Sequence, residues 1–163
     1  MICYIFLDID GVLNDENYIR MCYQKNGGYA MHMNHCPFDP NALTNLMYLV
    51  QYVRAIGSIP KIILSSSWRL HEIDIEIIKA RIAEYGLQIT NKTPYLHQNR
   101  GKEIESFLES QKLEEEYSFV ILDDESFDIN TIFPNNLVLV NPEYGLSSMD
   151  VEKAKTILER SIL

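Results

Sequence analysis

Two pairs of acidic residues follow directly after apolar segments, and they are the first candidates for chemistry in this chain. Asp8 and Asp10 end the segment YIFLDID, and Asp123 and Asp124 end the segment FVILDD. Carboxylates are costly to bury, so charge at the end of a core segment calls for compensation. Four carboxylates at one place would repel one another by about 4 kcal/mol per pair, at about 4 Å and an effective dielectric of about 20. Either some of these groups carry protons or a cation lies among them. Because they are hard oxygen ligands without a nearby histidine, the favoured cation is Mg²⁺.

An isolated acidic pair has a simpler interpretation, because Asp is common in solvated loops and at helix N-termini. In this chain the same pattern occurs twice, each time at the end of an apolar segment. A repeated arrangement of this kind favours one shared site over two unrelated loops.

The segments that must position these acids alternate between strand-like and helix-like patterns. Apolar runs predict strands at residues 2–8, 61–66, 87–90, 118–122 and 136–140. Helical spacing of apolar residues predicts helices at 40–55, 70–85, 102–112 and 151–158. Asp39 and Pro40 suit the N-cap and the first position of the first of these helices. Buried strands that alternate with helices predict an α/β fold, with a Rossmann-like parallel sheet sandwiched by helices in a single domain of residues 1–163.

Parallel sheets of this kind bind ligands beyond the carboxyl ends of their strands. The polar residues that follow the strands are therefore expected at one edge of the sheet. These residues are Asp8, Asp10, Ser65, Ser66, Asp123 and Asp124. Three clusters that lie far apart in the sequence would then form one site.

Four segments follow one another in the order of the motifs of a known superfamily. They are DIDGVLN, IILSSSW, NRGKEIESFL and VILDDESFD. In this order they resemble the four motifs of the haloacid dehalogenase (HAD) superfamily of phosphotransferases, from residue 2 to about 140. Within that superfamily, LSSSWR, RGKEI and ILDDES are most similar to the small HAD domains of Swiss-Army-Knife RNA-repair proteins. The resemblance implies a HAD-type fold with a minimal cap insert, and a Mg²⁺-dependent phosphatase activity.

The resemblance assigns roles to the residues that match its motifs. Asp8 would be the nucleophile that forms an aspartyl-phosphate, and Asp10 would be the general acid and base. Ser65 or Ser66 would donate a hydrogen bond to a phosphoryl oxygen. Arg100 would be the cation of the third motif, with its fork of donors on the phosphate, and Lys102 is the alternative.

Metal ligation, by the same resemblance, falls to Asp8, to Asp10 through its backbone carbonyl, and to the acids of the fourth motif. Asp123 and Asp124 would share Mg²⁺, one directly and one through water. An Asp-x-x-x-Asp interpretation would instead pair Asp124 with Asp128, although an exposed loop acid is the favoured interpretation of Asp128. Mg²⁺ and the cation of the third motif together would offset the charge of a phosphate that approaches the nucleophile.

Residues 15–39 occupy the place of the cap that covers the active site in the resembled superfamily, and they are too few for a folded cap domain. The site would then be open to bulky substrates, including the phosphorylated end of a polymer. This insert also contains Cys22, His32, His35 and Cys36, whose types suit zinc. Their C-x9-H-x2-H-C spacing matches no strong zinc pattern, so incidental residues in an irregular insert are the favoured interpretation.

Composition limits the classes of partner and the location. The 163 residues carry a formal net charge of −9, which argues against a broad nucleic-acid surface. A phosphorylated small molecule or a nucleic-acid end remains compatible where local positive charge overcomes the repulsion. No apolar run reaches membrane-spanning length, the N-terminus is unlike a signal peptide, and three cysteines suit a reducing cytoplasm. Trp68 could stack on a base, but core packing is the favoured interpretation.

The leading hypothesis is a Mg²⁺-dependent phosphomonoester hydrolase that acts on a nucleotide, a nucleic-acid terminal phosphate or a small phosphometabolite. The alternatives are a phospho-accepting, Mg²⁺-binding switch and an inactive scaffold that binds phosphorylated ligands. A receiver-like switch would have its acid pair early and its accepting Asp mid-chain, unlike the order here. A phosphomutase is disfavoured because the short insert leaves little to exclude water.

Overall fold

The computed structural model describes residues 1–27, 37–97, 99–111 and 116–160. Their strands are β1 (Ile2–Leu7), β2 (Ile59–Leu64), β3 (Ile89–Lys92), β4 (Tyr117–Asp123) and β5 (Leu137–Leu139). Their α-helices are α1 (Glu16–Lys25), α2 (Pro40–Ala55), α3 (Glu72–Ala83), α4 (Arg100–Ser110), α5 (Ile129–Ile132) and α6 (Ser148–Arg160), and a 3₁₀ helix spans Ser67–Leu70. Within the described ranges, no helix combines the length and apolarity needed to cross a membrane.

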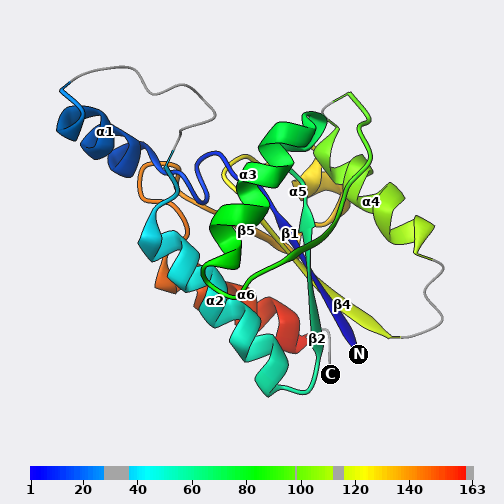
Figure 1. The fold of residues 1–163 in the computed structure, drawn as a ribbon. Helices are drawn as coiled ribbons and strands as arrows, with labels where there is room; N and C mark the ends of the chain where they lie inside the picture. Colours follow the sequence, from blue (N-terminus) through cyan, green and yellow to red (C-terminus); the bar gives the residue numbers. More distant parts are fainter. Residues whose placement is uncertain (28–36, 98, 112–115, 161–163) are drawn as a thin grey trace.

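The five strands form one parallel sheet in the order β3-β2-β1-β4-β5, which confirms the predicted Rossmann-like α/β fold. Helices cover both faces of the sheet (Figure 1). Residues of α2, α3 and α6 pack in the core on one face, and residues of α4 and α5 pack in the core on the other. Side chains of β1 alternate between these cores: Ile5 and Leu7 belong to the first, Tyr4 and Phe6 to the second. Because β1 is buried on both faces, its sequence is almost continuously apolar.

The register of the sheet brings the ends of the central strands to one level. Leu7 of β1 is paired with Leu64 of β2 on one side and with Leu122 of β4 on the other. The next backbone amides continue the ladder, since Asp8 N donates to Leu122 O at 3.0 Å and Ser65 N donates to Leu7 O at 2.8 Å. The residues that follow these three leucines therefore lie together at the carboxyl edge of the sheet.

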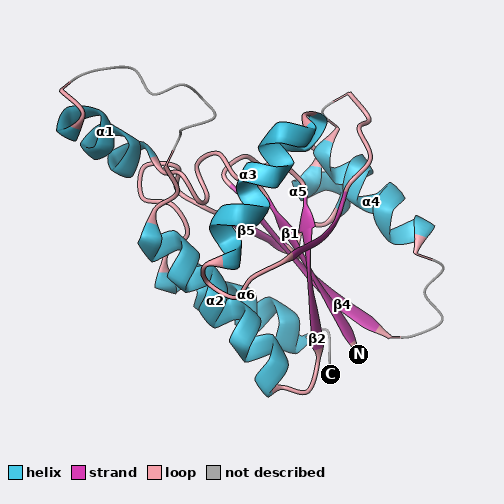
Figure 2. Ribbon diagram, in the orientation of Figure 1, coloured by secondary structure: helices cyan, strands magenta, loops and turns pink. Residues whose placement is uncertain are grey.

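Most elements with a strong apolar pattern form where the sequence predicts them, and α2 begins at Pro40 with the Asp39 side chain accepting from Asn41 N at 3.0 Å. The helix predicted at 70–85 is instead divided between the end of the 3₁₀ helix and α3, because His71 between them has extended backbone angles. Two helices were not predicted. Helix α1 contains no buried residue and α5 has four residues, so neither carries a core-facing repeat. Figure 2 shows the arrangement of helices, strands and loops.

Candidate active site

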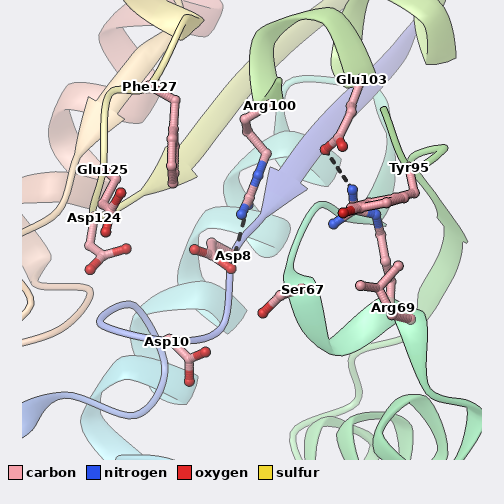
Figure 3. A pocket seen from close by; sticks show the side chains of 11 residues that line it. Asp8, Asp10, Ser67, Arg69, Tyr95, Arg100, Glu103, Asp124, Glu125 and Phe127 are labelled. Carbon is pink, nitrogen blue, oxygen red and sulfur yellow. Dashed lines mark hydrogen bonds and ion pairs between the residues drawn. The ribbon is translucent and has the colours of Figure 1, made fainter. Parts of the chain in front are cut away.

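A pocket of about 330 Å³ opens at the carboxyl edge of the sheet, beyond the ends of β1 and β4. Figure 3 shows the side chains that line it. Its acids include Asp8, Asp10 and Asp124, and its cations are Arg69 and Arg100. The pocket therefore lies where the strand pattern predicts a ligand site.

Asp8, Asp123 and Asp124 form an acidic trio at this edge. Each offers a carboxylate oxygen, and the three oxygens all lie within 4.8 Å of one another. Asp8 and Asp123 are 6% and 1% exposed, and Asp124 is half-buried. The structure thus brings together acids separated by more than a hundred residues.

Arg100 is the cation nearest this trio. It is the first residue of α4, and its Nη1 lies 3.0 Å from Asp123 Oδ2 and 3.5 Å from Asp8 Oδ1. The guanidinium is buried among these acids, so its charge is poorly screened by water. Lys102, the alternative cation, is exposed and does not line the pocket.

Asp128 has a structural partner that sequence reasoning did not identify. Its carboxylate accepts hydrogen bonds from the backbone N–H groups of Gly101, at 2.7 Å, and Lys102, at 3.1 Å. These are free amides of the first turn of α4, so Asp128 ties that turn in place. Asp128 does lie in a turn, as expected, but it is half-buried and holds the start of α4, and it is absent from the acidic trio.

Burial dominates the electrostatics of the trio. It raises the pKa of Asp8, while the charge of Arg100 opposes that shift. Burial, followed by repulsion from Asp8, raises the pKa of Asp123 to about 8 and that of Asp124 to about 6. Full ionisation of all three groups therefore needs more positive charge than Arg100 alone supplies.

The trio fits a magnesium ion in its chemistry. All three donors are carboxylate oxygens, with no nitrogen or sulfur ligand in the group. Mg²⁺ prefers such hard ligands and is commonly held by one or two carboxylates with waters and substrate oxygens. A divalent cation would also offset the repulsion that raises the pKa of Asp123 and Asp124.

Asp10 lines the pocket but lies outside the trio, and both of its oxygens are held by donors. Trp68 Nε1 donates to Oδ2 at 2.9 Å, and Asn14 Nδ2 donates to Oδ1 at 2.8 Å. Trp68 is buried and its ring centroid lies 5.9 Å from that of Phe38. The indole therefore packs in the core, as expected, while its N–H orients Asp10. The sequence carries no signal for this bond, because the two residues lie 58 positions apart.

The serines after β2 do not all face the pocket. Ser65 and Ser66 are buried, and Ser67 lines the pocket instead. The Ser66 hydroxyl hydrogen-bonds the Asp8 carboxylate, which counteracts the rise in its pKa. Within the described part of the chain, Ser65 Oγ has no hydrogen-bond partner. Only Ser66 of the predicted pair therefore contacts an acid of the site, and Ser67 was missed because the start of the 3₁₀ helix sets its direction.

A buried ion pair between Arg69 and Glu103 forms the opposite side of the pocket from Asp124 (Figure 3). Arg69 also donates to the backbone carbonyls of Ser66, Thr93 and Pro94. Its guanidinium thus ties together three segments that line the site. Sequence reasoning did not identify this pair: Arg69 and Glu103 both stand in segments that resemble the family, but they lie 34 positions apart and nothing in the sequence pairs them.

Gly11 allows the loop after β1 to approach Asp124. Its φ of +66° is a conformation that favours glycine. A Cβ at this position would lie 2.4 Å from Asp124 Oδ2, which is closer than real contacts allow. The glycine after the first acidic pair is therefore required both by backbone angle and by space.

The insert at 15–39 contains α1, which Figure 1 shows away from the sheet. Asp15 caps this helix, accepting from Tyr18 N at 2.8 Å. Cys22 lies on α1 and is half-buried. The other members of the considered zinc set, His32, His35 and Cys36, lie outside the described residues.

Comparison with known proteins gives one finding. The family model described as "HAD domain in Swiss Army Knife RNA repair proteins" matches residues 4–151. No curated protein and no solved structure matches the chain significantly. The matched range contains both acidic pairs, the serines after β2 and Arg100.

Proposed function

The chain belongs to the family of HAD domains found in Swiss Army Knife RNA repair proteins, and from this premise we propose that it is a Mg²⁺-dependent phosphomonoester hydrolase. The observation that carries the proposal is the placement of Asp8 beside both Arg100 and the acids Asp123 and Asp124. The Asp8 carboxylate has the Arg100 cation beside it. Asp123 and Asp124 next to it could hold a metal ion as a second cation. Both are needed before a phosphate can approach an anionic nucleophile.

The first chemical step is attack by a carboxylate oxygen of Asp8 on phosphorus. The new bond joins that oxygen to phosphorus, and the bond between phosphorus and the ester oxygen breaks. Asp10 gives a proton to the departing alkoxide, which leaves as an alcohol. Arg100 favours the ionised form of Asp8, against the rise in its pKa that burial causes, and adds positive charge where the transferring group is negative.

The second step restores the enzyme. Asp10, now ionised, accepts a proton from water, and the water oxygen attacks the phosphorus of the aspartyl-phosphate. The acyl-phosphate bond breaks, inorganic phosphate leaves and Asp8 is regenerated. Trp68 and Asn14 hold Asp10 by both oxygens through these steps.

Magnesium would be held by the carboxylates of Asp8, Asp123 and Asp124, with the backbone carbonyl of Asp10 as a further ligand by resemblance to the superfamily. When bound, it supplies charge neutralisation and orients the phosphate. Asp123 already has contacts for both oxygens, from Arg100 and from Glu125 N. Asp124 is therefore the better placed of the two for direct ligation.

The substrate in this proposal is a phosphorylated small molecule or a nucleic-acid end. The net charge of −9 disfavours a long polyanion across the surface. We place the activity in the cytoplasm, where such phosphoesters and reduced cysteines both occur.

The test is phosphate release from p-nitrophenyl phosphate by the wild type with and without Mg²⁺, and by Asp8→Asn with Mg²⁺. We expect release only from the wild type with Mg²⁺. Glu105→Gln, on the exposed side of α4, makes a similar carboxylate-to-amide change and should retain activity. Equal rates in all samples would refute the hydrolase, and a stable phosphoenzyme without turnover would indicate a switch.

A further inference from the structure

Two aromatic side chains stand at the rim of the active-site pocket. Tyr95 and Phe127 both line it, and they are 48% and 45% exposed. Figure 3 shows them on opposite sides, with Asp8 and Arg100 between them. Leu70, 49% exposed, lines the same pocket. The pocket therefore has a charged, buried floor and an apolar, exposed rim.

The backbone that carries this rim is unusual on both sides. Phe127 has a φ of +38°, and His97, close to Tyr95, has a φ of +54°. A bulky residue at positive φ is strained, and such a conformation persists only where the surroundings enforce it. The guanidinium carbon of Arg100 lies over the Phe127 ring, 5.4 Å from the ring centroid. The ring centroids of Tyr95 and His97 are 5.5 Å apart. Both aromatic rings are thus held at the rim by specific contacts.

Exposed aromatic rings forgo the burial that large apolar groups gain in a core. A ligand that covers them recovers this free energy, and a flat ring system does so best because it can stack on an aromatic face. A sugar or glycerol phosphate would place hydroxyl groups against the rim and would leave its apolar surface unmatched. The rim thus suits an ester with a phosphate at one end and a flat ring at the other.

We propose that Tyr95 and Phe127 bind the nucleobase of the leaving group, so that the substrate of this site is a nucleotide or the terminal nucleotide of a nucleic acid. This inference rests on the proposed hydrolase function and narrows its substrate class. A pocket of about 330 Å³ lies within the usual range for small-molecule sites. The overall negative charge favours a ligand whose remaining contacts are uncharged, as a nucleobase provides.

The first experiment compares adenosine 5′-monophosphate with ribose 5-phosphate, which has the same phosphoester without the base. Stacking on aromatic side chains is worth about 1–3 kcal/mol per base, so the wild type should prefer the nucleotide by about 5- to 160-fold in kcat/KM. Tyr95→Leu and Phe127→Leu should each reduce this preference several-fold. Tyr144→Leu, at an exposed tyrosine outside the pocket, should leave it unchanged.

Equal kcat/KM for the two esters, or an unchanged preference in both rim variants, would overturn the inference. A higher kcat/KM for O-phosphotyrosine than for the nucleotide would also overturn it. A 5′-phosphorylated trinucleotide distinguishes the two possible substrates. A kcat/KM above that of the mononucleotide identifies a nucleic-acid end, and a lower kcat/KM identifies a free nucleotide. Either result retains the nucleobase site.

Failure of the hydrolase proposal gives a different result, because no ester would release phosphate. The rim is then tested by calorimetric binding of adenosine 5′-monophosphate and of ribose 5-phosphate to the wild-type protein. Tighter binding of the nucleotide, weakened in Tyr95→Leu and Phe127→Leu, would support a nucleobase site without catalysis. Equal affinities would refute it.

Discussion

In the proposed mechanism Asp10 transfers protons, and two residues that do not react hold its side chain in place. Its two oxygens accept from Trp68 and Asn14, so its position is set before a substrate arrives. Pre-organised geometry of this kind contributes to catalysis because misplacement of a reacting group is costly. Trp68 is therefore a positioning residue for Asp10.

Replacing Trp68 by Phe keeps an aromatic ring in the core, but it removes the N–H donor together with part of the packing volume of the buried indole. Loss of one such hydrogen bond corresponds to about 1–2 kcal/mol, so we expect kcat to fall by about 5- to 30-fold. KM should change little, since the phosphate contacts remain. Steady-state kinetics with p-nitrophenyl phosphate gives both constants. A rise in KM with unchanged kcat would show that Trp68 acts on binding instead.

Gly11 permits a second test at the residue scale. Gly11→Ala introduces both a strained φ and an overlap with Asp124, whereas Gly57→Ala, at φ +78°, introduces the strain with no atom within 4 Å. We expect Gly57→Ala to cost about 1–2 kcal/mol of stability with activity retained. Gly11→Ala should cost more and should abolish activity by displacing Asp124. Urea unfolding and phosphate release measure the two effects, and equal stability losses with activity retained in both variants would contradict the overlap.

Helix α4 begins at Arg100, and its first turn is capped by Asp128 from the loop after β4. Asp128 accepts from the first free amides of α4, directly after Arg100. A lost cap of this kind costs about 0.5–2 kcal/mol. Because the freed turn carries the arginine, the cap should affect the site as well as the helix.

We expect Asp128→Ala to lower both the free energy of unfolding and kcat. Asp150→Ala is the matched control, because Asp150 accepts from Ser147 N at the start of α6, which carries no residue of the pocket. That variant should lose a similar stability and retain kcat. Urea unfolding and steady-state kinetics separate the cases, and an unchanged kcat in Asp128→Ala would show that Arg100 is held without the cap.

The elements also show what could be predicted from the sequence. Apolar periodicity identified the sheet and the helices that bury a face, because burial dictates that pattern. It also placed Asp8, Asp123 and Asp124 at one edge, since parallel register brings strand ends together. It did not identify α1, which buries nothing, or the roles of Ser67, Trp68 and Arg69. Those roles depend on the direction of side chains in a short 3₁₀ helix and on partners distant in sequence, neither of which a periodic pattern encodes.

At the scale of the whole molecule, the acidic trio makes stability depend on pH. Burial raises the pKa of Asp123 to about 8 and of Asp124 to about 6, whereas an unfolded Asp has a pKa of about 3.9. At a pH between the unfolded and the folded pKa of each group, the folded protein binds a proton that the unfolded chain has released. The stability contributed by these groups is therefore fully present below about pH 4 and is lost as the pH rises toward 8.

Magnesium competes with the same protons, so we expect it to raise Tm more at about pH 8 than at about pH 5. Thermal unfolding of the metal-free protein, with and without added Mg²⁺ at both pH values, measures this difference. Asp124→Asn should reduce the Mg²⁺ effect, while Glu105→Gln should preserve it. An unchanged Tm on addition of Mg²⁺ at both pH values would rule out a metal held by the trio.

Strand β1 is hydrogen-bonded to β2 and β4 along its length and lies between the two cores. To displace the end of β1, a fluctuation must separate two ladders and two apolar layers at once, which approaches the cost of global unfolding. The amides of β1 should thus be among the slowest to exchange with deuterium. A partly opened molecule, frayed at α1 or at the edge strand β5, would therefore still hold Asp8 in its folded position.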